Sequence, residues 1–134
     1  MVRHRNVFWI TALLSMGPLV AALAQAIPEA QIDKSRIYFG MPGSFENPGE
    51  VDMEVALQST PEFVEMKKKR IEHGTAKYWI LVADANDRVH RAIGVVGRAT
   101  DYDLIAEKGY LGKLDPPVDC DDITEAVVDR ILAE

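Results

Sequence analysis

Cysteine and histidine, which proteins often use to bind metals and to build nucleophilic sites, are scarce in this sequence of 134 residues. The single cysteine, Cys120, cannot form a disulfide within the chain, so we expect it to be buried, free or bridging two chains. Three neighbouring aspartates should raise its pKa and weaken it as a nucleophile. His73 and His90 show no spacing suited to a shared metal ion. We therefore expect no metal site and no cofactor.

Positive charge is also in short supply, with 15 Lys and Arg against 21 Asp and Glu and a net charge of −6 at pH 7. Binding to nucleic acid needs a basic surface, so we expect no nucleic-acid partner. The acidic residues do not form a calcium loop either. The cluster Asp115, Asp119, Asp121 and Asp122 lacks the alternating ligands and the glycine of such a loop.

The common catalytic constellations are missing as well. Ser59 and Thr60 have a sufficient role as helix caps, which leaves no reason to assign either as a nucleophile. Gly94 and Gly97 do not match a phosphate-binding fingerprint. We therefore do not expect an enzyme, although a small enzyme with an unrecognised site is kept as a third hypothesis.

What the sequence does contain begins with a three-part N-terminal segment. Arg3 and Arg5 precede an uncharged apolar run over residues 7–24, and Ala24-Gln25-Ala26 follows with the small-x-small pattern of a signal peptidase site. We expect residues 1–26 to be a cleavable signal peptide that directs the chain to the periplasm. Because the run is barely long enough to cross about 30 Å of bilayer, an uncleaved inner-membrane anchor is the alternative. Cleavage would leave 13 basic and 21 acidic residues, a net charge of −8.

The segment that follows is rich in turn-forming residues and then becomes regular. Residues 27–48 should form a loosely ordered lead-in, in which residues 35–39 are a candidate edge strand. The partial alternation of Val51, Met53 and Val55 predicts a strand over residues 50–57. The sequence STPE at residues 59–62 then predicts a helix start, with cap hydroxyls, a proline at the first helical position and an acid in the first turn.

Residues 61–99 look helical apart from a break at Gly74-Thr75. An apolar seam recurs every three or four residues along the second part, at Tyr78, Val82, Ala85, Val89, Ala92 and Val96. Two geometries fit, a single long helix that tolerates Gly74 and a helical hairpin that turns near residues 73–75. We favour the hairpin, a coiled-coil-like arm, because glycine suits a helix end and residues 67–70 would place positive charge there.

The C-terminal third supplies the remaining elements of the predicted fold. Residues 102–106 predict a second strand, and residues 110–114 are a candidate to pair back with it. Residues 121–125 cap a last helix, whose apolar face carries Ile123, Val127, Val128, Ile131 and Leu132. Since a hairpin returns the chain to its start, we expect the strands that flank it to be antiparallel neighbours. The predicted fold is α+β: a small antiparallel sheet body, a helical hairpin and a C-terminal helix.

One basic cluster is the exception in this acidic chain. It consists of Lys67, Lys68, Lys69 and Arg70, with Lys77 close behind. In the hairpin geometry these residues lie near the tip, beside Tyr78 and Trp79. They form either a solvated helix face or a contact surface for anionic lipid, lipopolysaccharide or a client chain. We take these seven residues as the candidate binding site.

Four short stretches share the pattern of a known family. The sequences GEVDME at 49–54 and LQSTPEF at 57–63 resemble the opening of the Skp/OmpH family of periplasmic chaperones. The sequences YDLI at 102–105 and DITEAVV at 122–128 resemble its return strand and its closing helix. The resemblance implies that residues 49–134 form a Skp/OmpH-like domain. It further implies a homotrimer in which strands from three subunits form the body and helical arms hold unfolded outer-membrane proteins.

The chain departs from that family in two respects, a shorter arm and an acidic rather than basic composition. With a rise of about 1.5 Å per residue, each half of the arm would reach only roughly 20–35 Å. We therefore expect an exported holdase chaperone of the Skp/OmpH type with a shortened arm. The alternative is a non-catalytic structural or adaptor subunit that packs its helices on a fixed partner in the cell envelope.

Overall fold

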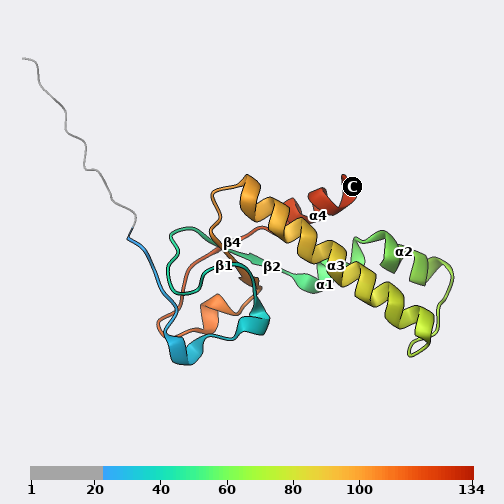
Figure 1. The fold of residues 1–134 in the computed structure, drawn as a ribbon, viewed down its shortest axis with the longest axis horizontal. Coiled ribbons are helices and arrows are strands. Elements are labelled where there is room, and N and C mark those ends of the chain that lie inside the picture. Colours follow the sequence, from blue (N-terminus) through green and yellow to red (C-terminus); the bar gives the residue numbers. More distant parts are fainter. Residues whose placement is uncertain (1–22) are drawn as a thin grey trace, which may run out of the picture.

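Within residues 23–134, four short strands form one sheet at one end of the molecule, accompanied by four α-helices (Figure 1). The computed structural model describes residues 23–134. The strands are β1 (Ile37–Gly40), β2 (Pro48–Val51), β3 (Leu104–Glu107) and β4 (Asp121–Asp122). The helices are α1 (Met53–Gln58), α2 (Pro61–Lys68), α3 (Ala76–Ala99) and α4 (Thr124–Leu132). Of these, α3 and α4 pack on the sheet, and α2 packs on α3 beyond it. The predicted α+β class is confirmed, and of the predicted signal peptide only residues 23–26 fall within the described part.

The direction of the strands differs from the prediction. The order across the sheet is β1-β3-β2-β4. β1 runs antiparallel to β3, whereas β2 runs parallel to both β3 and β4. The prediction that the strands flanking the hairpin are antiparallel is therefore wrong, and the sheet is mixed.

The unequal lengths of the two hairpin helices explain this parallel pairing. α2 has 8 residues and α3 has 24, so α3 rises about 36 Å where α2 rises about 12 Å. The returning helix thus runs from the tip past α2 and on across the sheet (Figure 1), which agrees with its contacts to α2, β1 and β3. The chain re-enters the sheet where β2 began, and the register pairs Pro48 with Leu104 and Gly49 with Ile105.

The strand predicted over residues 50–57 is wrong over most of its length, because β2 ends at Val51 and α1 begins at Met53. Asp52 makes this change possible. Its Oδ1 accepts hydrogen bonds from the backbone N–H of Glu54 at 3.1 Å and of Val55 at 3.3 Å, which is the geometry of a helix N-cap. The aspartate at the cap position favours a helix, and this signal outweighed the short alternation of apolar residues that favours a strand.

The predicted helix start at Pro61 is confirmed. The Thr60 hydroxyl accepts a hydrogen bond from the N–H of Phe63 at 3.3 Å, and Pro61 occupies the first turn. α2 and α3 are separate helices that pack against each other, so the hairpin geometry holds and the single long helix does not. The turn between them occupies residues 69–75.

The sheet is covered on both faces. On one face the helices bury a core with Val51 and Ile105 of the sheet, consisting of Val51, Ala56, Val89, Ala92, Ile93, Val96, Ile105, Ile123, Val127 and Ile131. On the other face the N-terminal segment and the loop after β3 bury a second core, consisting of Ile27, Phe45, Leu104, Ala106, Tyr110, Leu111, Leu114 and Val118. Alternate residues of β3 therefore point into different cores, as a two-sided strand requires.

Residues 27–48, predicted as a loosely ordered lead-in, are instead integral to the second core. Ile27 is 3% exposed and Phe45 is 1% exposed. The candidate edge strand does form, shifted by one or two residues, as β1. Turn-forming residues indicated irregular backbone correctly, but irregular backbone is compatible with a fixed position once apolar side chains anchor it.

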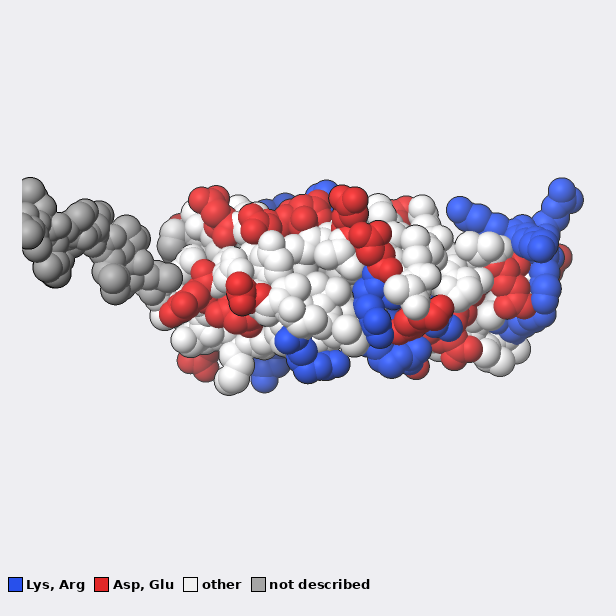
Figure 2. Space-filling view, turned by 90° about the horizontal axis from the view of Figure 1, so that it is seen from above, with Lys and Arg blue, Asp and Glu red and all other residues white. Residues whose placement is uncertain are grey.

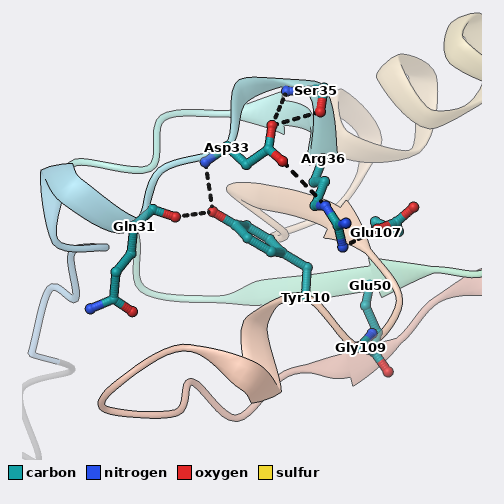
Figure 3. Close-up of polar contacts among 8 residues, drawn as sticks. All are labelled: Gln31, Asp33, Ser35, Arg36, Glu50, Glu107, Gly109 and Tyr110. Carbon is teal, nitrogen blue, oxygen red and sulfur yellow. Dashed lines mark hydrogen bonds and ion pairs between the residues drawn. The ribbon is translucent and has the colours of Figure 1, made fainter.

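Polar contacts also fasten this N-terminal segment to the body (Figure 3). The Tyr110 hydroxyl donates to the carbonyl of Gln31 at 2.7 Å and accepts from the N–H of Asp33 at 2.9 Å. Arg36 pairs with Glu107 at 2.9 Å and with Asp33 at 3.2 Å. Tyr110 belongs to residues 110–114, which were predicted as a candidate strand. They contain the 3-10 segment Leu111–Lys113 instead, and this segment places the tyrosine against residues 31–33.

Candidate functional site

The far end of the helical hairpin carries most of the residues that the sequence singled out. We call residues 64–80 the hairpin tip; it comprises the end of α2, the turn and the start of α3. Lys67, Lys68, Lys69, Arg70 and Lys77 are all exposed there. Figure 2 shows the result, with blue side chains gathered at the right-hand end of the molecule and red side chains prominent on the body. The hairpin brings the separate Lys77 to the same end as the contiguous basic run.

Most of these cations are free of carboxylate partners. Lys69 forms an i,i+4 ion pair with Glu65 at 2.7 Å, and this contact lowers the pKa of Glu65. Among the ion pairs of residues 23–134, none involves Lys67, Lys68, Arg70 or Lys77. Long exposed basic side chains without partners are available to an incoming anionic surface.

Three aromatic rings cluster within the hairpin tip. His73 in the turn packs on Tyr78, with ring centroids 4.4 Å apart, and Tyr78 meets Trp79 edge to face at 5.1 Å. Trp79 nevertheless remains 54% exposed, and Ile80 and Val64 are 60% and 55% exposed. The hairpin tip therefore carries both exposed large apolar side chains and basic side chains that form no ion pair among the described residues.

The apolar seam predicted along α3 is mostly internal. Ala85, Val89 and Ala92 are fully buried and Val96 is 7% exposed, because the second half of α3 covers the sheet and α4. Tyr78 and Val82, nearer the tip, are half-buried. The seam residues available to a partner are therefore limited to these two.

A second cationic surface was missed by the sequence analysis. An open groove of about 670 Å³ runs along α3 and the end of α4. Its lining includes His90 and the arginines Arg91, Arg98 and Arg130, together with the acidic Asp87 and Glu134. None of the ion pairs in the described part of the chain uses these three arginines. Guanidinium groups in this arrangement suit oxyanions. The seven-residue spacing of Arg91 and Arg98 was readable in the sequence, but only tertiary packing adds Arg130.

The remaining candidates for chemistry do not converge. Burial, and next the carboxylate of Glu50, raise the pKa of the Cys120 thiol to about 12, so it is protonated at neutral pH. His73 lies at the tip, whereas His90 lies against the Tyr38 ring at 5.5 Å. Within residues 23–134 no group of three or more His, Cys, Asp and Glu side chains is placed to hold a metal ion. No helix in that range is long and apolar enough to span a bilayer.

Comparison with known proteins identifies no relative: no protein-family model, no curated protein and no solved structure matches this chain.

Proposed function

We propose that this protein is exported to the periplasm and binds unfolded or membrane-associated outer-membrane proteins there as a holdase chaperone, without catalysing a reaction. The observation that carries the proposal is the composition of the hairpin tip. Three large apolar side chains (Trp79, Ile80 and Val64) are exposed at this tip, which also carries four basic side chains that form no ion pair within residues 23–134. The limited resemblance to the Skp/OmpH family is consistent with this role.

The physical basis is that an unfolded client exposes apolar side chains that a folded protein hides. Trp79 and Ile80 offer apolar area for transient burial, worth about 25 cal/mol per Å² removed from water. Such a small contact is weak, because association costs several kcal/mol in lost freedom. Weak contact suits a holdase, which must release its client unaltered.

We further propose that three copies assemble through the sheet body, so that several tips act on one client. Among residues 23–134, β1 and β4 are the two edge strands of the sheet, and an edge strand is the part of a sheet that can pair with a strand of another chain. Linking several weak sites raises the overall affinity by multivalency. Exposed tip cations would also draw the assembly toward anionic lipid, by about 1 kcal/mol for each basic residue near the surface.

The test compares a tip variant with a body variant in an aggregation assay. Trp79→Gln with Ile80→Gln should abolish most of the protein's ability to suppress light scattering by an unfolded β-barrel client. Leu132→Gln on α4, where the side chain is 68% exposed, is the matched control and should act like the unmodified protein. Equal suppression by both variants, or no suppression by the unmodified protein, would reject the holdase proposal.

Molar mass measured by light scattering with and without reductant tests the assembly. A trimer in both conditions is expected. A dimer that reductant converts to monomer would show that Cys120 bridges two chains, and either that result or a monomer in both conditions would contradict the trimer proposal. Retention on anionic vesicles that is lost in Lys67→Gln with Lys68→Gln would identify lipid contact.

An adaptor role is the second candidate, and the aromatic packing at the tip favours it. His73, Tyr78 and Trp79 form a preformed cluster, which suits one fixed partner better than many flexible ones. This role predicts a single co-purifying envelope protein that is lost when Tyr78 or Val82 is made polar. Because Val89 and Val96 are buried, polar substitutions there would test folding rather than binding.

A further inference from the structure

In the N-terminal segment, Gln25 is paired with Phe45 through its backbone. Its backbone N–H donates to the carbonyl of Phe45 at 2.6 Å, and its carbonyl accepts from the N–H of Phe45 at 2.9 Å, forming an isolated antiparallel bridge. Phe45 is itself 1% exposed in the second core. Gln25 therefore belongs to the folded body by its backbone pairing.

The residues on either side of Gln25 differ sharply. Leu23 is 85% exposed, a poor position for a large apolar side chain, and Ala24 is exposed too. Ile27 is 3% exposed, and its N–H donates to the carbonyl of Pro42 at 2.8 Å. The boundary between the body and whatever precedes it thus falls between Ala24 and Gln25.

Two overlapping cleavage signals are present at this boundary. Ala24-Gln25-Ala26 directs a cut after Ala26, and Ala22-Leu23-Ala24 satisfies the same small-x-small requirement for a cut after Ala24. A cut after Ala26 would remove both hydrogen bonds of the Gln25–Phe45 bridge. It would also place a charged ammonium on Ile27, beside a buried side chain, where a charge loses hydration. A cut after Ala24 keeps both hydrogen bonds and places the ammonium on the exposed Gln25.

We propose that the leader is removed after Ala24, so that the mature chain begins at Gln25 rather than at Ile27. The proposal rests on the export part of the proposed function and is independent of the holdase role. It assigns residues 22–24 as the processing site and gives Gln25 a structural role.

The experiment expresses the full-length chain in a bacterial host that has a periplasm and determines the N-terminus of the periplasmic product by intact mass and N-terminal peptide analysis. A product that begins at Gln25, with or without loss of ammonia by cyclisation of the glutamine, is expected. A product that begins at Ile27 would overturn the proposal while leaving export intact. An uncleaved chain in the membrane fraction would overturn both.

Two substitutions separate the overlapping signals. Ala22→Leu disrupts only the cut after Ala24, so it should slow processing and move the N-terminus of the product to Ile27, through the signal that remains at residues 24–26. Ala26→Leu disrupts only the cut after Ala26, changes an exposed side chain, and should leave processing at the rate of the unmodified chain. The opposite pattern would refute the assignment: Ala26→Leu blocked, and Ala22→Leu processed at the unmodified rate to the same product as the unmodified chain.

Discussion

Arg70 shows how a single residue determines where a helix ends. Its φ of +48° is the only positive value at a non-glycine residue among those described. It follows the C-cap Lys69 of α2, and two hydrogen bonds close the helix around it: Arg70 N–H to Lys67 O at 3.4 Å and Ile71 N–H to Met66 O at 3.1 Å. This is a Schellman closure with arginine in the position that glycine usually occupies.

We expect Arg70→Gly to stabilise the fold by about 0.5–1 kcal/mol. The left-handed conformation costs a residue with a Cβ about 1–2 kcal/mol, and the extra freedom of glycine in the unfolded chain offsets about half of that. Lys69→Gly is the matched control. It removes one positive charge at the neighbouring residue, where φ is −91° and glycine has no advantage, so it should lower the free energy of unfolding by a similar amount. Urea unfolding measures both, and two changes of the same sign would contradict the argument.

α3 is the element that joins the tip to the sheet, and two glycines in it have different reasons to be small. A Cβ on Gly97 would lie 2.6 Å from the ring of Phe39, a residue of β1 packed against the core. A Cβ on Gly94 would lie 3.1 Å from Nη1 of Arg98, the mobile end of an exposed side chain. Only the first contact is fixed by the fold.

Substitution by alanine should therefore have opposite effects at the two glycines. Gly97→Ala should destabilise by about 1–3 kcal/mol, because overpacking against Phe39 outweighs the gain in helix propensity. Gly94→Ala should stabilise by about 0.5–1 kcal/mol, because Arg98 can move aside. Thermal or urea unfolding of the two variants checks this, and a stabilised Gly97→Ala protein would show that α3 and β1 are not held together as described.

Over the whole molecule, Arg88 joins three separate segments. It donates to both carboxylate oxygens of Glu62 in α2, with contacts of 2.8–3.0 Å, and to Glu134 beyond α4 at 2.7 Å. The side chain of Arg88 is 24% exposed, and those of Glu62 and Glu134 are 12% and 21% exposed. Hydrogen bonds from Arg88 are the main reason that the pKa of Glu62 is lowered from its ordinary value of 4.5.

Arg88→Met should cost about 1–2 kcal/mol at pH 7, between the values for surface and buried ion pairs. Because the folded-state pKa of Glu62 is depressed, its contribution is fully present above pH 4.5 and is lost as pH falls through the folded-state value. The difference between the unmodified protein and the variant should therefore shrink below about pH 4.5, as measured by urea unfolding across pH. Arg36→Met is the control; its ion-pair partners are about half exposed, and it should cost less. A pH-independent difference for Arg88→Met would contradict the coupling.

Local signals in the sequence determined the elements of this protein. The Thr60-Pro61 cap, the break before Thr75 and the spacing of apolar residues in α3 each act within a few residues, so the helical hairpin and the basic tip were predictable. The short alternation around Met53 was misleading, because the cap formed by Asp52 acts over the same few residues and prevailed.

Only the tertiary structure decided three features: the direction of β3, the fixed position of residues 27–48, and which apolar seam residues of α3 remain accessible to a partner. The strand direction depends on the relative lengths of α2 and α3 and on what α3 covers on its way back, which no local pattern encodes. The burial of Ile27, Phe45 and Val89, and the addition of Arg130 to the arginines of α3, depend on contacts between residues far apart in the chain. Such contacts form only when apolar faces from distant parts of the chain pack together. The sequence therefore determines them, but no local pattern in it reveals them.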